Sequence, residues 1–457
     1  MTIAEVTDRN NNDISLGDTT TVEGVVIGDF QGSDEMNGFF IQDPNGAPDS
    51  PSSNGIFVFV PEANEDFFGF DVEVGQTVEV TGEVAEFNGR RQLDFISDIS
   101  ILNDEINAIE PTVINFPEAT DGELERFVGT LVTIPQEMTV SQNFFLGRYG
   151  QLTLSSPDEN GIPGRLFQPT QLFTPGSDAA NQLFSDNAER LLVLDDGQDI
   201  NPFGDNPDPA PYFQELPNGS LTLRAGATTS NLVGVLDFGR INSSSDPNVD
   251  LRLQPTVEPT FQNRNPRTPE PENVGGDIKI GNFNVLNYFT TLDERGADNA
   301  EEFERQQQKI FDALIDIDAD VVGLVEIENN GFGADSAIQN LVDGLNEALT
   351  EAGISDVTYD FIDPGVDQIG VDAITNALIY NTQTIEPVGD SAIIETGAFS
   401  PDNTSDNGGD GGYNRPPLAQ TFSEIETGEL FTVAVNHFKS KRDPDEDAEV
   451  RAGDLDS

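Results

Sequence analysis

The sequence predicts a protein of several domains, in which a β-rich N-terminal half precedes a layered α/β domain. Residues 1–103 contain about five short runs that are apolar or alternate between apolar and polar residues, broken by Gly, Asn, Asp and Pro. From residue 277 onward, runs of strand length alternate with segments of helical periodicity, which is typical of an α/β domain. At 457 residues, the chain is long enough for roughly two or three domains with cores of their own.

The first domain, residues 1–103, is expected to be an OB-type barrel, a Greek-key barrel of short strands. Such barrels often bind nucleic acid through a basic groove with stacking aromatic residues. Arg90, Arg91 and Phe87 are the candidates for such a surface here, and they make only a small one. A scaffold role for the barrel is therefore the preferred interpretation.

Residues 104–262 are again β-rich and are predicted to form a second domain. The segments ERFVGTLVTI and TSNLVGVLDFG echo TTTVEGVVIGDF of the first domain, which leaves a second OB-like barrel open. Residues 263–276 are rich in Pro, Asn and Gly and lack apolar periodicity, so they are predicted to be a linker. The α/β domain then occupies residues 277–457.

The α/β domain is expected to begin with a strand, an amphipathic helix over residues 301–316, and a second strand that contains VVGLV. A strand that is apolar along its whole length is what a sheet covered on both faces requires. A further helix is expected over residues 336–349, with Ser336 as its N-cap. Further strands are predicted at 357–362, 373–380, 417–422 and 430–436.

Two polar side chains lie at or near the ends of the first two predicted strands. Asn284 follows the apolar residues of the first strand, and Glu326 ends the run VVGLV. Open α/β sheets commonly bind their ligands at strand ends. A hard divalent cation is the simplest reason to pair a carboxylate with an amide oxygen there, so Glu326 and Asn284 are predicted metal ligands.

The single histidine of the chain, His437, ends the apolar run FTVAV. Of the four lysines in the chain, Lys439 and Lys441 fall beside it together with Arg442. A local cationic group of this kind indicates a place where an anionic substrate is received. A lone histidine is more often structural, but its pKa also suits proton transfer to a leaving oxygen.

Arg415 and Asp372 complete the candidate site. Arginine has the best shape for bidentate contact with a phosphate, although a surface arginine paired with a carboxylate is the simpler interpretation of Arg415 alone. Asp372 begins a predicted strand and is a candidate to orient His437.

The charge balance of the chain is extreme. It has 83 Asp and Glu residues against 21 Lys and Arg residues, and a formal net charge of −62. Screening by salt or divalent cations would relieve this self-repulsion, so an extracellular medium fits, as does the cytoplasm of a halophile. The same charge argues against a general affinity for nucleic acid.

Other classes of site and location are restricted by composition. The absence of cysteine excludes disulfides and thiolate metal sites. No run of about 18 apolar residues would span a membrane, so no membrane partner is expected. No protein partner is inferred.

Four motifs together carry a family resemblance. FNVLNYF, GLVEIEN, NRPPLAQTF and VNHFKSK occur in this order and resemble the extracellular bacterial nucleases of the endonuclease/exonuclease/phosphatase superfamily, to which pancreatic deoxyribonuclease is distantly similar. In the front half, LGRYGQLTLS, NAERLLVLDDG and LRLQPTVEPTF resemble the β-rich region that precedes the catalytic domain in those nucleases.

The resemblance implies a four-layer α/β sandwich, a site for Mg²⁺, Mn²⁺ or Ca²⁺, and a secreted bacterial protein. By motif, Asn284 matches an asparagine near the metal and Glu326 a metal-binding glutamate. Arg415 matches an arginine that contacts phosphate, and His437 a histidine that acts toward the leaving group.

The sequence also departs from the family pattern. The G-D-x-N and final S-D-H segments of the family are not found, and Gly453-Asp454-Leu455-Asp456 follows His437 too closely to replace the first of them. The α/β domain is therefore expected to be a partial sandwich, incomplete at its C-terminus and nearly inactive alone.

The expected function is metal-dependent hydrolysis of phosphodiester bonds in DNA, with RNA as a further substrate left open. One alternative is a phosphomonoesterase or a phospholipid phosphodiesterase of the same superfamily. A second is an acidic, calcium-binding extracellular scaffold or adhesion protein without enzymatic activity.

Overall fold

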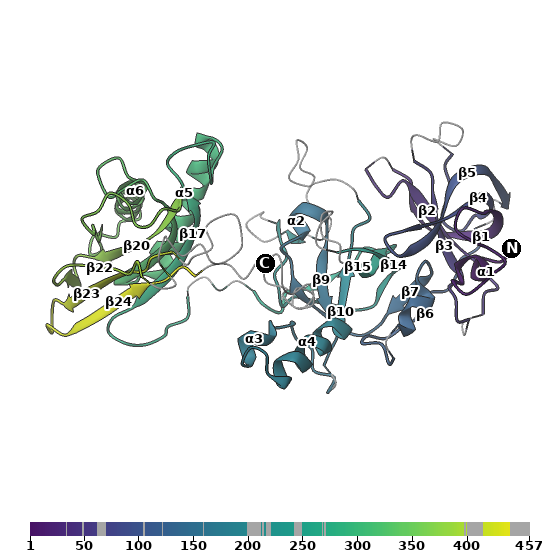
Figure 1. Cartoon of the computed structure of the whole chain (residues 1–457), viewed down its shortest axis with the longest axis horizontal. Coiled ribbons are helices and arrows are strands. Elements are labelled where there is room, and N and C mark those ends of the chain that lie inside the picture. The colour runs from purple at the N-terminus through teal and green to yellow at the C-terminus, as the bar shows by residue number, and fades with distance from the viewer. Residues whose placement is uncertain are drawn as a thin grey trace. The chain divides into compact units, whose positions relative to one another are not determined.

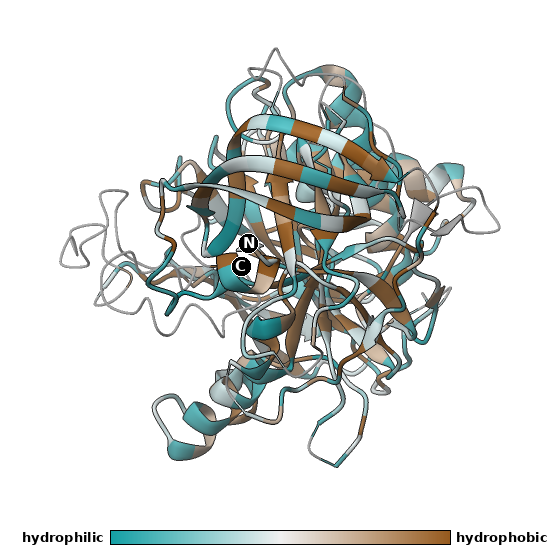
Figure 2. Cartoon of the chain, turned by 90° about the vertical axis from the view of Figure 1, so that its right-hand side faces the viewer, coloured by the Kyte–Doolittle hydropathy of each residue, from teal (hydrophilic) through white to brown (hydrophobic). Residues whose placement is uncertain are grey.

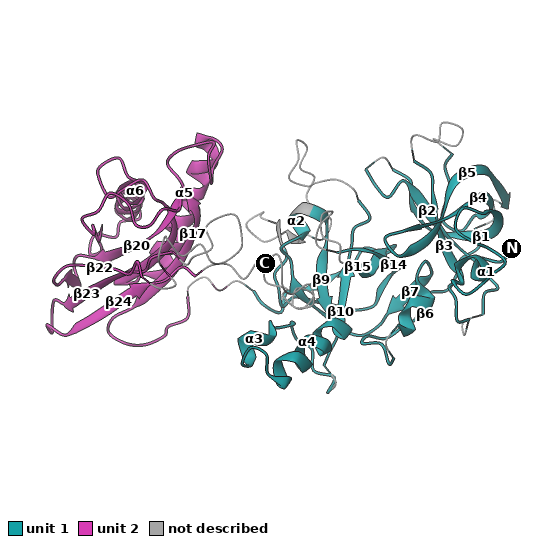
Figure 3. Cartoon of the chain, in the orientation of Figure 1, with its two compact units in different colours: residues 1–266, 447–457 teal, residues 267–446 magenta. Residues whose placement is uncertain are grey.

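The computed structural model of the chain divides into two compact units, residues 1–266 and residues 267–446 (Figure 3). The boundary falls inside the stretch 263–276, and residues 1–103 are not separated from residues 104–262. The structure describes residues 1–438 except 33, 48–49, 62–69, 104–105, 121, 159, 199–211, 213, 216–220, 242–248, 267, 269–270, 397–398 and 400–414.

Unit 1 begins with a closed barrel in which the strand order is β1-β2-β3-β5-β4 (Figure 1). Strands β3 and β5 pair in parallel, while the other pairs are antiparallel. The OB-type assignment stays a prediction. The elements are α1 (Ile3–Thr7), β1 (Thr19–Phe30), β2 (Gly38–Gln42), β3 (Gly55–Phe59), β4 (Thr77–Phe87) and β5 (Arg90–Asn103).

The barrel strands follow the expected period of two. In β4, buried and partly exposed residues alternate from Thr77 to Ala85, and hydrophobic and hydrophilic segments alternate along the strands in Figure 2. This pattern places one face of each strand in the barrel core and the other toward its surroundings. On the outside, Phe30, Phe40 and Phe57 pack with Val235 of β14.

The rest of unit 1 is built on a mixed sheet of order β16-β13-β8-β9-β10-β15-β14-β7-β6. The echo segments noted in the sequence include β7 and most of β14, and these two strands pair antiparallel within this sheet. A second OB-like barrel stays a prediction. The strands are β6 (Thr112–Val113), β7 (Leu131–Ile134), β8 (Met138–Gln142), β9 (Leu152–Ser155), β10 (Leu191–Leu194), β13 (Thr228–Thr229), β14 (Leu232–Arg240), β15 (Val249–Pro255) and β16 (Phe261–Gln262).

Shorter elements accompany this sheet. Strands β11 (Gln214–Glu215) and β12 (Leu221–Thr222) pair with each other. The helices are η1 (Glu123–Phe127), α2 (Leu146–Tyr149), α3 (Pro169–Leu172) and α4 (Asp178–Arg190).

A buried chain of ion pairs joins the barrel to this sheet. Arg90 of β5 pairs with Asp237 of β14 at 2.7 Å, and Asp237 also pairs with Arg252 of β15 at 2.5 Å. Arg252 in turn pairs with Asp195 at 2.7 Å. Burial opposes the charged form of Asp237, but the two guanidinium groups outweigh it and lower its pKa below the ordinary value.

Unit 2 contains two sheets and two helices among its described residues. The first sheet has the order β17-β18-β20-β19, and in the second β23 pairs with β21, β22 and β24. The elements are β17 (Ile280–Tyr288), α5 (Ala300–Ile317), β18 (Val321–Glu328), α6 (Ala337–Glu351), β19 (Tyr359–Phe361), β20 (Ile374–Asn381), β21 (Ile385–Pro387), β22 (Ala392–Ile393), β23 (Leu418–Glu424) and β24 (Leu430–Val435).

The central strand β18 is covered on both faces, as its apolar run predicts. Val322 and Leu324 belong to the core shared with α5 and α6, while Val321 and Val325 belong to the core shared with the second sheet. Strands β17 and β18 are parallel, and β18 and β20 are antiparallel. The two helices pack on one face of the first sheet, and the second sheet packs on its other face. A complete four-layer sandwich stays a prediction.

The predicted helices and strands of unit 2 are confirmed within one to a few residues at their ends. The hydroxyl of Ser336 accepts a hydrogen bond from the N–H of Gln339 at 3.3 Å, which confirms it as the N-cap of α6. The short strands β21 and β22 were not predicted. None of the helices in the described part of the chain has both the length and the apolar character needed to cross a membrane.

Candidate functional site

Backbone in the left-handed region marks the edge where β17 and β18 end. Leu286 and Asn287 have φ angles of 53° and 52°, and Glu326 has a φ of 70°. The pairing of β17 with β18 is irregular between Asn284 and Tyr288, and that of β18 with β20 between Val325 and Ile327. Such backbone is costly for residues other than glycine and is found preferentially at functional sites.

The carboxylate of Glu326 is the centre of this edge. Its Oε1 accepts a hydrogen bond from Nδ2 of Asn284 at 2.8 Å, and its Oε2 accepts one from the N–H of Asn287 at 3.1 Å. The N–H of Leu286 donates to Oδ1 of Asn284 at 2.7 Å, which fixes the amide with its nitrogen toward Glu326. In this arrangement Asn284 orients the carboxylate, and its role as a direct metal ligand stays a prediction.

His437 faces the same carboxylate. Its Nε2 lies 3.8 Å from Oε1 of Glu326, and its side chain is 18% exposed. Burial lowers the pKa of His437 below its ordinary value; the positive charge of Arg415 lowers it further, while Glu326 and Asp372 oppose the shift. The neutral imidazole is therefore favoured. Its Nδ1 is buried without a hydrogen-bond partner in the part of the chain that the structure describes.

Asp372 holds two arginines beside this group. Its Oδ2 lies 2.9 Å from Nη2 of Arg415, and its Oδ1 lies 3.3 Å from Nη1 of Arg295. The predicted contact of Asp372 with His437 is not among the hydrogen bonds of the described residues, so its role as the residue that orients His437 stays a prediction. Here its carboxylate orients Arg415 instead.

Arg295 and Glu328 were not nominated from the sequence. Glu328 is buried and accepts hydrogen bonds from the N–H groups of Thr290 and Thr291, at 2.7 and 3.2 Å, and from their hydroxyls, at 2.9 and 2.5 Å. It thereby anchors the loop that carries Arg295. The second glutamate of VEIEN, next to the run VVGLV, was the available signal for Glu328; nothing local marked Arg295.

The predicted substrate-binding residues Lys439, Lys441 and Arg442 lie outside the described residues. Within the described ranges, no group of three or more His, Asp or Glu side chains is arranged to hold a metal ion.

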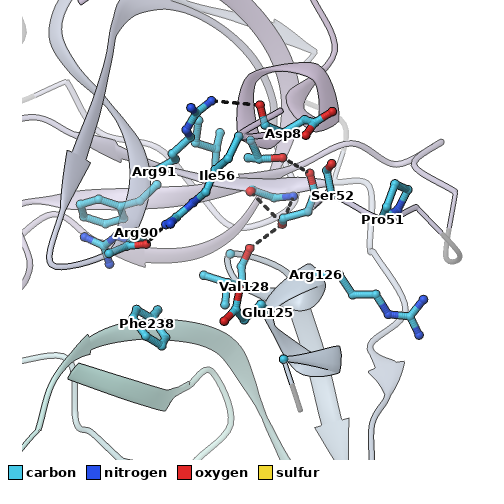
Figure 4. Close-up of a pocket in the computed structure, with 18 of the residues that line it drawn as sticks. Asp8, Pro51, Ser52, Ile56, Arg90, Arg91, Glu125, Arg126, Val128 and Phe238 are labelled. Atoms are coloured by element: carbon cyan, nitrogen blue, oxygen red, sulfur yellow. Dashed lines mark hydrogen bonds between the residues drawn. The ribbon is translucent and has the colours of Figure 1, made fainter. Parts of the chain in front are cut away.

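A pocket of about 550 Å³ lies in unit 1, and its lining includes the barrel residues Arg90 and Arg91 (Figure 4). Both arginines make internal contacts. Arg90 is buried against Asp237 and lies over the ring of Phe57, and Arg91 donates to the carbonyls of Val6 and Asp8 at 2.8 and 3.2 Å. Their use within the fold favours the scaffold interpretation of the barrel over nucleic-acid binding.

Comparisons with known proteins give partial likenesses. No model of a protein family matches the chain, and no curated protein matches it. Among solved structures, the catalytic domain of human nocturnin with a bound sulfate anion is 18% identical, with a TM-score of 0.23; the match covers 36% of this chain and 50% of that one.

Two further solved structures match in part. An endonuclease/exonuclease/phosphatase family protein from Bacteroides thetaiotaomicron is 17% identical, with a TM-score of 0.23, over 35% of this chain and 50% of that one. The hypothetical protein ygiW from E. coli is 18% identical, with a TM-score of 0.16, over 22% of this chain and 88% of that one. The chain thus spans half the length of the nocturnin catalytic domain and of the Bacteroides protein. Likenesses of this size carry no functional weight.

Proposed function

We propose that unit 2 carries a metal-dependent phosphodiesterase site, which acts on nucleic acid, with DNA as the principal substrate. The observation that carries this proposal is the carboxylate of Glu326, which Asn284 and Asn287 orient by hydrogen bonds and whose Oε1 lies 3.8 Å from Nε2 of His437. Glu326 and Asn287 both have left-handed backbone. The motif resemblance to extracellular nucleases supports it independently, because it selects Asn284, Glu326, Arg415 and His437 as well.

The donor set at Glu326 fits a hard cation. Both oxygens accept hydrogen bonds from neutral donors, so each retains a lone pair and the full negative charge is available. Mg²⁺ commonly binds through one or two carboxylates and completes its shell with water and substrate phosphate. Glu326 would hold Mg²⁺, Mn²⁺ or Ca²⁺, and the bound cation would supply Lewis-acid stabilisation of charge on the phosphate.

The charges around the site suit an anionic substrate. Arg295 and Arg415 balance Asp372 and Glu326, and His437 is favoured in its neutral form. The cluster is therefore close to neutral on a chain with a net charge of −62. A divalent cation would make it locally positive, so a phosphate would be drawn to this place rather than elsewhere on the surface.

His437 is the group that moves a proton. In its favoured neutral form it accepts a proton, and Nε2 is the ring nitrogen that faces Glu326. The role at the leaving oxygen that the family resemblance implies needs the imidazolium. A phosphate bound beside Arg415 would favour that form, because a nearby negative charge raises the pKa of histidine.

Nicking of supercoiled plasmid DNA tests this function, since product accumulates even at low turnover. Because the chain is expected to be nearly inactive alone, we expect slow nicking that depends on Mg²⁺, stops with EDTA and is lost in Glu326→Gln and His437→Asn. Arg305→Gln is the matched control, because Arg305 is exposed on α5 and pairs with Glu301 at 3.1 Å. Equal nicking by wild type and Glu326→Gln, or none by wild type, would contradict the proposal.

The two alternatives give different results in parallel assays. Hydrolysis of a phosphomonoester or a phospholipid in preference to DNA would favour the other esterases of the superfamily. A melting temperature that rises with Ca²⁺, without turnover and equally in Glu326→Gln, would favour the calcium-binding scaffold. An extracellular location belongs to the same proposal, because the motif resemblance implies it and the net charge of −62 is compatible with it.

A further inference from the structure

Arg295 and Arg415 approach the two opposite oxygens of one carboxylate. Nη1 of Arg295 lies 3.3 Å from Oδ1 of Asp372, and Nη2 of Arg415 lies 2.9 Å from Oδ2. The side chain of Arg415 is 19% exposed, and that of Arg295 is 49% exposed. Because a single negative charge is shared by two positive ones, this trio carries a net positive charge, and the more exposed arginine extends it toward solvent.

The loop that carries Arg295 is firmly built. Glu328 holds its start through the N–H and hydroxyl groups of Thr290 and Thr291. At its other end, Gly296 has a φ of +94°, and a Cβ there would lie 2.3 Å from the carbonyl oxygen of Asn287. Asn287 is also the residue whose N–H binds Glu326. The position of Arg295 is therefore tied to the proposed cation site through the backbone.

A purely structural role explains this arrangement poorly. Exposed ion pairs contribute little to stability because water competes for both partners. An exposed ion pair at 3.3 Å does not need a loop that is anchored by a buried glutamate and held by a close glycine contact. Arginine remains charged at all ordinary pH values, and its planar group is well suited to phosphate oxygens.

We infer that Arg295 binds a second phosphate, adjacent to the one held by Arg415, and so selects a nucleic-acid strand over an isolated phosphate ester. This inference rests on the proposed function of unit 2. Arg415, next to His437, serves the reacting phosphate, while Arg295, on the other side of Asp372, meets the neighbouring phosphate along the strand. A small phosphodiester has no second phosphate to place at Arg295.

The test compares a long and a short substrate. The binding of a fluorescein-labelled single-stranded oligonucleotide is measured by anisotropy in Ca²⁺ at several salt concentrations, and hydrolysis of bis(p-nitrophenyl) phosphate is measured in Mg²⁺. Arg295→Gln should raise the Kd for the oligonucleotide about tenfold and reduce the slope of log K against log salt by about 0.7, the value of one phosphate contact on a single strand.

The variants separate the possible roles of Arg295. In Arg295→Gln the loss of oligonucleotide binding should exceed the loss of bis(p-nitrophenyl) phosphate hydrolysis by about tenfold, whereas Arg415→Gln should impair both. Arg295→Lys keeps the charge and should keep the salt slope. Arg305→Gln should change neither quantity.

Two results would overturn the inference: an affinity and salt slope in Arg295→Gln that match those of Arg305→Gln, or equal losses on both substrates. If the wild-type chain hydrolyses neither substrate, the proposed function fails. In that case the salt slope of Arg295→Gln still decides whether Arg295 contacts a phosphate, so the two failures remain distinct.

Discussion

At the scale of single residues, the pKa of His437 responds to the charges around it. Burial lowers its pKa first, Arg415 adds to the shift, and Glu326 and Asp372 oppose it. Since His437 is the only histidine in the chain, its imidazole signals in NMR spectra need no assignment. Each neighbouring charge can therefore be tested by one substitution and one titration.

Substitution of the two neighbours should move the pKa of His437 in opposite directions. Arg415→Gln removes a positive charge and should raise it, whereas Glu326→Gln removes a negative charge and should lower it. Arg305→Gln, which removes an exposed charge paired with Glu301, should leave the titration unchanged. Shifts of the same sign in both site variants would show that His437 does not lie between these two charges.

The same shift has a consequence for stability. The pKa of His437 in the folded chain is lower than its ordinary value of 6.5, so the unfolded chain binds the proton more readily. The contribution of the neutral imidazole to stability is complete above about pH 6.5 and is lost as the pH falls through the folded pKa. His437→Asn should remove this part of the pH dependence of the unfolding free energy.

The sequence could predict only those site residues that a local sequence pattern marks. Asn284, Glu326 and His437 were found because each lies in or just after an apolar run of strand length, and such runs are recognisable from composition. Arg295 was not found because it is linked to the site by its contact with Asp372, which lies 77 residues away along the chain. The left-handed φ of Glu326 was equally invisible, since it arises from pairing with two neighbouring strands.

At the scale of elements, the loop between β17 and α5 couples the strand ends to Arg295. Both helices of unit 2 were predictable, because their apolar faces repeat at helical spacing and their caps are local. The loop was not, because Glu328 and Gly296 act through contacts that depend on the folded sheet. Gly296 offers the most specific test of this coupling.

Gly296→Ala should destabilise the loop, because alanine would be strained at a φ of +94° and its Cβ would meet the carbonyl oxygen of Asn287. We expect a loss of about 1–3 kcal/mol in urea unfolding. Gly333→Ala is the matched control, because a Cβ at Gly333 would have nothing within 4 Å and its φ is not in the left-handed range; it should change stability by less than about 0.5 kcal/mol. Equal effects of the two substitutions would refute the role given to Gly296.

At the scale of the whole molecule, ion pairs hold structural elements together in unit 1 as well as in unit 2. Arg90 was a candidate for a nucleic-acid surface, with a scaffold role preferred, and it is buried against Asp237, which lies 147 residues further along the chain. Sequence proximity to Phe87 and Arg91 suggested a stacking groove, whereas tertiary pairing decided the outcome. The ion pairs from Arg90 to Asp195 instead fix the barrel on the sheet that follows it.

Asp237→Asn should strongly destabilise unit 1, because it leaves the guanidinium groups of Arg90 and Arg252 without their shared buried carboxylate. Removing one partner of a buried ion pair typically costs about 3–5 kcal/mol. Arg9→Gln, which breaks the exposed pair of Arg9 and Glu86, should cost less than about 1 kcal/mol. Urea unfolding followed by limited proteolysis of each unit should find the loss in unit 1 alone, and a loss no greater than that of Arg9→Gln would contradict this account.

Paramagnetic Mn²⁺ tests whether Glu326 holds a divalent cation beside His437. Addition of substoichiometric Mn²⁺ should broaden the imidazole signals of His437 in the wild-type chain, and excess Mg²⁺ should restore them, because the two ions compete for the same carboxylate. In Glu326→Gln the broadening should be lost at the same Mn²⁺ concentration. Signals that stay sharp in the wild type, or that broaden equally in Glu326→Gln, would contradict the claim.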